Sequence, residues 1–422
     1  MTITRNIGWR SWLKGTAAAV AMVAGVGLAV PAQAADPLKI GFGMALTGGL
    51  AGAGKAALIA IQIWADDVNA AGGIMGRKVE LKYYDDQTNP ATVPGIYTKL
   101  LDVDKVDFVV SGYGTNLIAP AMPIVMQRGL VFPSLFGLAA NEKFKYKNYF
   151  QIMPAGPEPL TDWSKGFFDV AMAQNPKPTT IALVGADAEF SRNAVKGARE
   201  HAKKLGLKIV YDQTYPPKTA DYTPIIRAIQ ARNPDIVYVG SYPPDSVGMV
   251  KAATEVGLKT KMFGGGMVGL QYASIQTALG PKLNGIINYD FWVPAPTLKF
   301  KGVEAFLAKY QKAAEGQGVD PLGHYLPPYA YGYMQVLAQA IEGAKSTDHA
   351  KVGDYMRKSE FDTVVGKVRF APNGEWAKSR ALMVQFQHIE NNDLKQFEKP
   401  DSRVVLYPSE WKSGDVVYPY SK

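Results

Sequence analysis

Residues 38–69 read LKIGFGMALTGGLAGAGKAALIAIQIWADDVN, and the rest of the chain is organised around this stretch. The apolar run from Leu38 to Phe42 is too short for a helix, so it predicts a buried strand. From Gly54 onward, apolar residues recur at spacings of three and four, which predicts an α-helix that begins where the glycines stop. A strand, a glycine-rich loop and a helix N-terminus leave backbone N–H groups free at one place. The stretch therefore predicts a ligand-binding mouth.

The same glycines allow a second interpretation. Residues 49–55, GLAGAGK, match the G-x-x-x-x-G-K pattern of a nucleotide-binding phosphate loop. That motif continues with a Ser or Thr whose hydroxyl holds Mg²⁺, and this chain has Ala56 there. We therefore favour a glycine-rich turn that lets a ligand approach the backbone.

Residues 1–34 have the pattern of a secretory signal peptide. Arg5, Arg10 and Lys14 supply a positive region, an apolar run extends from Ala17 to Val30, and the small-x-small triplet AQA ends at Ala34. The apolar run is shorter than the roughly 20 residues that a spanning helix needs. We expect cleavage near Ala34, export to the periplasm and a mature chain that is not embedded in a membrane.

The composition excludes several classes of protein. The 422 residues carry a formal net charge of +9 and no cysteine, so neither a disulfide framework nor a lipid attached at cysteine is expected. The densest basic patch, Lys143, Lys145 and Lys147, alternates with aromatic residues. We interpret it as a solvated loop whose aromatic side chains pack inward, and expect no nucleic-acid partner.

Signals for catalysis are weak. The four histidines lie far apart in the sequence without metal-ligand spacing, and no G-x-S-x-G elbow is present. The pair Asp85–Asp86 ends a predicted strand, where a turn is more typical than a catalytic pair of carboxylates. We therefore expect a protein that is not an enzyme, with no catalytic residue, no metal and no cofactor.

Short apolar strands alternate with amphipathic segments along most of the chain, which predicts parallel sheets with helices on both faces. Pro/Gly-rich or aromatic links occur at 151–159 and at 288–296. Open α/β sheets bind ligands beyond the carboxyl ends of their strands. The pattern thus predicts two α/β lobes with a hinged cleft between them.

Five segments, in order, resemble the periplasmic leucine/isoleucine/valine-binding protein family. They are LKIGFGMALTGG, ADDVNAAGGIMGRKVELKYYDDQTNP, VSGYGTNLIAPAMPIV, IALVGADAEFSRNAVKGAREHAKKLG and NPDIVYVGSYPPDSVGMVKAATEVGLKT. The resemblance implies a type I periplasmic binding protein fold: two doubly wound parallel-sheet lobes joined by a three-crossing hinge. It places residues 35–152 and 290–366 in an N-terminal lobe, and 153–289 and 367–422 in a C-terminal lobe.

The same resemblance implies the solute-binding component of an ABC importer, which delivers a small-molecule ligand to permease subunits with their ATPase. A ligand-sensing receptor domain that signals through a membrane partner is the alternative. Branched-chain or other hydrophobic amino acids are the usual ligands of the family, and a hydrophobic or aromatic carboxylate is the other possibility.

The family's binding loops match particular residues here. Thr115 stands where a hydroxyl holds the ligand carboxylate together with backbone N–H groups, and Phe136 stands where amino-acid binders have a second threonine. The full set of expected ligand-binding residues is Tyr113, Gly114, Thr115, Asn116, Ser134, Leu135, Phe136, Phe190, Tyr242, Gly266 and His324.

Two departures from the family's pattern bear on the ligand. Gly266 stands where α-amino-acid binders carry an acid for the ammonium group, and Ala53 where a bulky aromatic often sits. A buried ammonium without a counter-charge is costly, so these residues favour a ligand without an α-amino group. An acid from another loop, Asp187, Glu189 or Asp245, is the alternative source of the counter-charge.

Overall fold

The computed structural model describes residues 36–420. Its strands are β1 (Leu38–Met44), β2 (Val79–Asp85), β3 (Phe108–Val109), β4 (Phe132–Ser134), β5 (Tyr149–Gln151), β6 (Thr180–Ala186), β7 (Lys208–Tyr215), β8 (Ile236–Ser241), β9 (Met262–Met267), β10 (Ile287–Asp290), β11 (Glu360–Thr363), β12 (Gly366–Arg369), β13 (Leu382–Phe386) and β14 (Arg403–Tyr407).

The α-helices are α1 (Ala51–Ala70), α2 (Val93–Asp102), α3 (Thr115–Ile118), α4 (Met122–Gln127), α5 (Pro159–Met172), α6 (Glu189–Lys204), α7 (Thr223–Gln230), α8 (Pro243–Val256), α9 (Ala273–Leu279), α10 (Val303–Ala314), α11 (Pro327–Ala344) and α12 (His349–Lys358). Short 3₁₀ helices are η1 (Ala119–Ala121), η2 (Val268–Gln271), η3 (Gly280–Leu283), η4 (Leu394–Glu398), η5 (Pro400–Ser402) and η6 (Ser409–Trp411).

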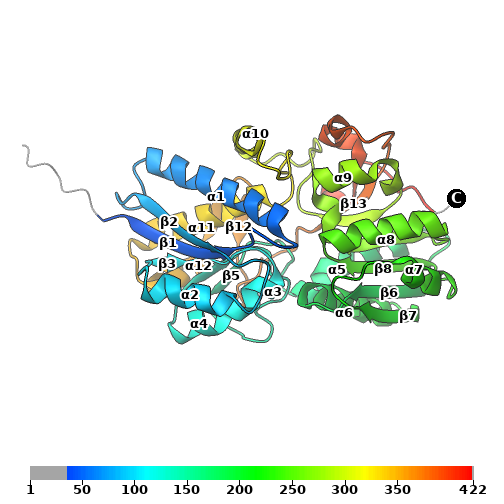
Figure 1. Cartoon of the computed structure of the whole chain (residues 1–422), viewed down its shortest axis with the longest axis horizontal. Helices are drawn as coiled ribbons and strands as arrows, with labels where there is room; N and C mark the ends of the chain where they lie inside the picture. Colours follow the sequence, from blue (N-terminus) through cyan, green and yellow to red (C-terminus); the bar gives the residue numbers. More distant parts are fainter. Residues whose placement is uncertain (1–35, 421–422) are drawn as a thin grey trace, which may run out of the picture. The chain divides into compact units, whose positions relative to one another are not determined.

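The strands form two separate groups (Figure 1). The first group holds the parallel sheet β2-β1-β3 and the parallel pair β4-β5. The second is a seven-stranded sheet in the order β14-β13-β10-β9-β8-β6-β7, parallel except where β13 pairs with β10 and with β14. We call these groups, with the helices packed on them, the first lobe and the second lobe. The predicted α/β class with parallel sheets is confirmed.

The chain passes between the two lobes three times: after β5, after β10 and after β12. Helices α10 and α11 follow β10 but pack on α1 of the first lobe, and strands β13 and β14 then return to the second. The exact lobe boundaries given by the family resemblance stay a prediction.

Helix α1 begins earlier than the sequence predicts. It starts at Ala51 rather than after Gly54, so Gly52 and Gly54 lie inside its first turn. An added Cβ at Gly54 would lie 1.9 Å from the carbonyl oxygen of Ala45, so glycine is needed there for the helix to approach the strand β1.

The loop between β1 and α1 is held by polar side chains at the end of β2 and just after it. Asp85 accepts hydrogen bonds from the N–H groups of Leu46 (3.0 Å) and Thr47 (3.2 Å) and from the Thr47 hydroxyl (2.7 Å). Thr88 donates to the Thr47 carbonyl (2.7 Å). The turn predicted at Asp85–Asp86 is confirmed, and it fixes the mouth of the first lobe.

The predicted signal peptide lies outside the described residues. Between residues 36 and 420, no helix combines the length and the apolar character that a membrane crossing requires. In the basic patch, Lys143, Lys145 and Lys147 are exposed, while the aromatic residues between and after them are buried or half-buried. The predicted inward packing of those aromatics is confirmed.

The two glycines at the start of α1 give a matched stability test. We expect Gly54→Ala to destabilise the protein by about 1–3 kcal/mol, because the new methyl group overlaps the Ala45 backbone. We expect Gly52→Ala to be neutral or to stabilise by up to about 1 kcal/mol, because its Cβ meets nothing within 4 Å and alanine favours a helix. Urea unfolding measures both, and equal effects would contradict the packing.

Candidate ligand-binding site

A small pocket lies where residues of both lobes meet. Its lining, which we call the cleft pocket, consists of Leu50, Tyr113, Gly114, Thr115, Phe136 and Met153 from the first lobe, Trp163, Phe190, Tyr242 and Val268 from the second, and Tyr325 from the loop before α11. No Asp, Glu, Lys, Arg or His is among these residues. The pocket is therefore neutral and largely aromatic.

The structure brings together six of the eleven residues that the sequence singled out: Tyr113, Gly114, Thr115, Phe136, Phe190 and Tyr242 line the cleft pocket. Asn116, Ser134 and Leu135 belong to the same loops without lining it. Gly266 lies inside β9, where an added Cβ would be 3.1 Å from the Tyr238 hydroxyl. His324 is bound elsewhere, as described below.

Thr115 is the first residue of α3 and is 1% exposed. Its Oγ1 accepts a hydrogen bond from the N–H of Leu138 (3.0 Å), which leaves the hydroxyl proton as a donor. Thr115 lies inside the helix, and Gly114 is the residue at its N-cap. The first N–H groups of a helix have no acceptor within it. This corner therefore offers the hydroxyl and backbone donors that suit a carboxylate.

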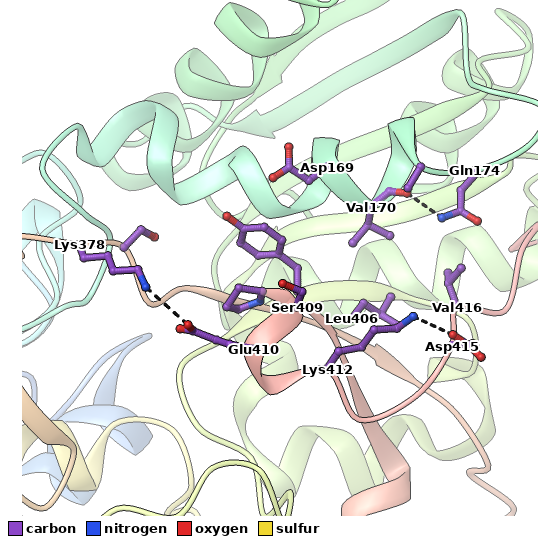
Figure 2. A pocket seen from close by; sticks show the side chains of 14 residues that line it. Asp169, Val170, Gln174, Lys378, Leu406, Ser409, Glu410, Lys412, Asp415 and Val416 are labelled. Atoms are coloured by element: carbon purple, nitrogen blue, oxygen red, sulfur yellow. Dashed lines mark hydrogen bonds and ion pairs between the residues drawn. The ribbon is translucent and has the colours of Figure 1, made fainter.

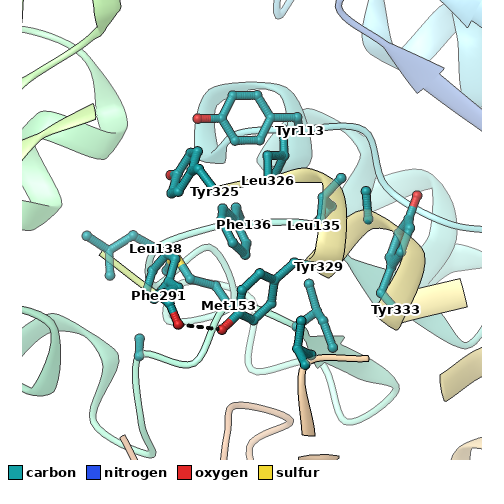
Figure 3. Packing of buried hydrophobic residues seen from close by; sticks show 14 of the residues in the cluster. Tyr113, Leu135, Phe136, Leu138, Met153, Phe291, Tyr325, Leu326, Tyr329 and Tyr333 are labelled. Atoms are coloured by element: carbon teal, nitrogen blue, oxygen red, sulfur yellow. Dashed lines mark hydrogen bonds between the residues drawn. The ribbon is translucent and has the colours of Figure 1, made fainter. Parts of the chain in front are cut away.

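The loop that follows β4 places an aromatic ring in the cleft. Three of its N–H groups donate hydrogen bonds to buried side-chain acceptors. Leu135 donates to Ser111 Oγ (2.7 Å), Phe136 to Gln151 Oε1 (3.0 Å) and Leu138 to Thr115 Oγ1 (3.0 Å). Phe136 takes a φ of +60°, which is unusual for a residue with a side chain. Its ring contacts Phe291, Tyr325 and Tyr329 at centroid distances of 4.9–5.3 Å (Figure 3).

Four buried tyrosine hydroxyls form two pairs near the cleft pocket, and the rings of Tyr113 and Tyr325 contact Phe136. Tyr113 and Tyr272 share a hydrogen bond of 3.2 Å, and Tyr289 and Tyr325 share one of 3.0 Å. Burial raises the pKa of all four phenols, so they stay neutral and act as hydrogen-bond donors or acceptors. Tyr113 belongs to the first lobe and Tyr272 to the second, so the first pair joins the lobes directly.

The described structure is a closed form of the cleft. The cleft pocket has a cavity volume of about 20 Å³, which is room for one water molecule. Ligand sites for small molecules usually measure roughly 300–1,000 Å³. A second hydrogen bond across the cleft, from Asn193 Nδ2 to the carbonyl of Leu138 (2.9 Å), holds the lobes together. A ligand must therefore part the lobes or move side chains to enter.

None of the three acids considered as counter-charges lines the cleft pocket. Asp187 pairs with Arg192 at 2.8 Å on the surface. Asp245 accepts hydrogen bonds from the hydroxyls of Tyr215 (3.2 Å) and Tyr222 (2.9 Å), and burial raises its pKa. Burial also raises the pKa of Glu189, the neighbour of the lining residue Phe190. In this closed form, an ammonium group would find no carboxylate at the pocket wall.

His324 belongs to a buried charged cluster behind the cleft. Arg403, 1% exposed, donates to Asp290 Oδ2 (3.1 Å) and lies 2.7 Å from Nδ1 of His324. A guanidinium only donates, so Nδ1 must accept and the imidazole is neutral. Burial lowers the pKa of His324, and burial raises the pKa of Asp290 to about 6 although Arg403 opposes that rise. Trp292 packs on the imidazole, beneath the hinge.

Arg403 was not singled out from the sequence. It stands between Ser402 and a run of apolar strand residues, where an arginine is usually at the surface. Only the pairing of β14 with β13, which in turn pairs with β10, brings it beside Asp290. The partner is more than a hundred residues away, so no local pattern identifies the pair.

A larger groove lies on the second lobe (Figure 2). It measures about 540 Å³ and is bounded by α5 and the segment after β14. Two ion pairs lie within its lining: Lys378 with Glu410 (3.5 Å) and Lys412 with Asp415 (2.7 Å). A further lining residue, Asp169, pairs with Lys165. None of the expected ligand-binding residues lines it. We therefore place the candidate site at the cleft pocket and not in this groove.

A sequence profile of the periplasmic binding protein family matches residues 37–392. The chain belongs to this family. The family resemblance seen in the sequence is therefore confirmed. The leucine-, isoleucine-, valine-, threonine- and alanine-binding protein of Pseudomonas aeruginosa is 25% identical over 357 residues, which are 84% of this chain and 91% of that protein. The Leu/Ile/Val-binding protein of Escherichia coli K12 is 24% identical over 81% of this chain and 88% of that protein.

Solved structures of this family share the fold. The substrate-binding protein LivJ of Streptococcus pneumoniae, in complex with isoleucine, has a TM-score of 0.70 at 22% identity and covers 88% of this chain and 100% of LivJ. A solute-binding protein of Rhodopseudomonas palustris, in complex with benzoate, has a TM-score of 0.72 at 16% identity, covering 88% and 95%. These structures confirm the type I periplasmic binding protein fold for this family member.

The buried pair behind the hinge gives a second stability test. We expect Asp290→Asn to cost about 3–5 kcal/mol, because it leaves Arg403 buried without its counter-charge. We expect the double variant Asp290→Asn/Arg403→Met to regain a substantial part of that loss, because both charges are then removed. Urea unfolding of the wild type, the two single variants and the double variant measures the coupling free energy between Asp290 and Arg403. A single-variant cost below about 1 kcal/mol would contradict the cluster.

Proposed function

We propose that this family member is the periplasmic solute-binding component of an ABC importer of the branched-chain amino acid type. It is not an enzyme: it closes its two lobes on a small carboxylate-bearing ligand and presents the closed form to permease subunits with their ATPase. The observation that carries the proposal is the cleft pocket, in which residues of both lobes surround the hydroxyl of Thr115.

The carboxylate has its partners at one corner of the pocket. The Thr115 proton and the first N–H groups of α3 are donors that strengthen when the acceptor is charged. No cationic side chain lines the pocket, so backbone N–H groups and a hydroxyl bind the ligand's carboxylate. This arrangement suits one carboxylate and leaves the rest of the pocket to the ligand's body.

We propose a hydrophobic or aromatic carboxylate as the preferred ligand. Phe136, Phe190 and Trp163 present aromatic rings to the cleft, and such rings favour apolar or aromatic bodies. An α-ammonium group would be removed from water beside these rings without a carboxylate partner, which is costly. A ligand without that group avoids the cost.

Branched-chain amino acids are the second candidate. The relatives from Pseudomonas aeruginosa and Escherichia coli are named for binding such amino acids. For this chain to bind them in the same way, an acid must reach the cleft when the ligand closes it. Glu189, at the start of α6 and next to the lining residue Phe190, is one candidate for this acid.

Matched ligand pairs test the ligand class. We expect 4-methylpentanoate and 3-phenylpropanoate to raise the melting temperature more than leucine and phenylalanine, because each acid lacks only the ammonium group of its partner. A ligand at 100 times its Kd adds about 2.7 kcal/mol to stability. A thermal shift given only by the amino acids would reject the preference for a des-amino ligand. No shift with any of the four would count against the proposed carboxylate site.

Thr115 tests the carboxylate corner. We expect Thr115→Ala to weaken the binding of 3-phenylpropanoate by about 1–3 kcal/mol, because it removes a donor to a charged group. Thr115→Ser keeps the hydroxyl and should retain most of the affinity. Isothermal titration calorimetry measures both. Equal affinities for the alanine and serine variants would remove the hydroxyl from the site.

A further inference from the structure

A second cavity adjoins the cleft pocket at its outer side. It measures about 340 Å³ and lies between the start of α1 in the first lobe and the second lobe. Its lining, which we call the mouth cavity, is Gly49, Leu50, Gly52, Ala53, Pro243, Tyr272, Ser274, Ile275, Gly318, Val319 and Asp320. Leu50 lines both cavities, so a single side chain is shared by their walls.

Two exposed glycines line this cavity. An added Cβ at Gly49 or Gly52 would meet nothing within 4 Å, and neither residue has a positive φ. Neither packing nor backbone conformation therefore requires glycine there, unlike Gly48, whose φ is +83°, or Gly54, which touches Ala45. A glycine inside a helix costs about 1 kcal/mol relative to alanine. Because Gly49 and Gly52 have no side chains, they leave room in the mouth cavity.

The boundary between the two cavities is formed by residues of both lobes. Tyr113 lines the cleft pocket, Tyr272 lines the mouth cavity, and their hydroxyls are joined by the hydrogen bond of 3.2 Å across the lobes. Opening the lobes breaks this bond and moves Leu50 away from the second lobe. Because Leu50 lines both cavities and this pair stands between them, parting the lobes would join the cavities on either side.

The mouth cavity suits an uncharged group. Leu50, Ala53, Pro243, Ile275 and Val319 give it an apolar wall. Asp320 is the one acidic or basic residue in the lining, and a second anionic group would be repelled by its carboxylate. That carboxylate is 4% exposed, and its Oδ1 accepts hydrogen bonds from the N–H groups of Ala273 (3.2 Å) and Leu322 (3.3 Å).

We propose that the ligand is an elongated monocarboxylate whose carboxylate binds at Thr115 and whose uncharged tail, a ring or a chain, lies in the mouth cavity against Gly49 and Gly52. This inference rests on the proposed function and deepens it, because it sets the length of the ligand. Benzoate, with its carboxylate directly on the ring, is too short to fill both cavities. A carboxylate separated from its ring by two or three carbons carries the ring farther from Thr115, toward Leu50 and the mouth cavity.

A ligand-length series tests the proposal on the wild-type protein. Isothermal titration with benzoate, phenylacetate, 3-phenylpropanoate and 4-phenylbutanoate should show affinity rising by at least tenfold from the first to the best of the longer acids. Benzoate binding as tightly as the longer acids would overturn the extension and leave the proposed carboxylate site intact. Failure of all four acids to bind would instead overturn the proposed function together with the extension.

A larger side chain placed in the mouth cavity distinguishes the loss of room for the ligand's tail from a general effect of the substitution on the protein. We expect Gly52→Leu to weaken the binding of the best longer acid by at least tenfold, and to change benzoate binding by less than twofold. The matched control is Gly95→Leu in α2, an exposed glycine near a helix start whose added Cβ also meets nothing within 4 Å. The control should change neither affinity.

Thermal melting of each variant without ligand confirms that it folds, since the space at Gly52 and Gly95 accepts a new side chain. Gly52→Leu could instead weaken the binding of short and long acids equally, or leave both affinities unchanged. Either result would show that the tail does not lie in the mouth cavity, and the proposal would be wrong.

Discussion

The hydrogen bonds that fix the loop after β4 are the constraint on which the cleft depends. Buried acceptors on Ser111, Gln151 and Thr115 hold three of its N–H groups, and so maintain a left-handed backbone at Phe136 that costs roughly 1–3 kcal/mol. Thr115 holds this loop through its hydroxyl and also lines the pocket. The carboxylate corner and the aromatic wall are therefore positioned relative to each other before any ligand arrives.

Closure and the hinge rest on different interactions. The lobes are joined across the cleft by the hydrogen bonds Tyr113–Tyr272 and Asn193–Leu138, each of which contributes only about 0.5–1.5 kcal/mol. Behind the cleft, the buried Arg403–Asp290 pair ties β14 to the end of β10, where the chain leaves the second lobe. Weak contacts at the front and a fixed cluster at the back suit a protein that opens without losing its hinge.

The sequence predicted the α/β class and the strand-end loops that form the pocket, because strand–helix alternation and strand-end loops are local patterns. The three passages between the lobes came from the family resemblance. The sequence misplaced the start of α1, because Gly52 and Gly54 looked like a loop although Gly54 is a packing requirement of the helix. The family resemblance placed His324 near the ligand, and no local pattern showed its contact with Arg403, which is distant in sequence. Cavities such as the mouth cavity depend on contacts between lobes that no single segment encodes.

A crystal structure of the protein with 3-phenylpropanoate tests the central claim most directly. The account predicts one carboxylate oxygen within hydrogen-bond distance of Thr115 Oγ1, with the ligand's ring beside Phe136 and directed past Leu50 toward the start of α1. A ligand bound in the groove between α5 and the segment after β14, or a carboxylate held by a charged side chain away from Thr115, would contradict it.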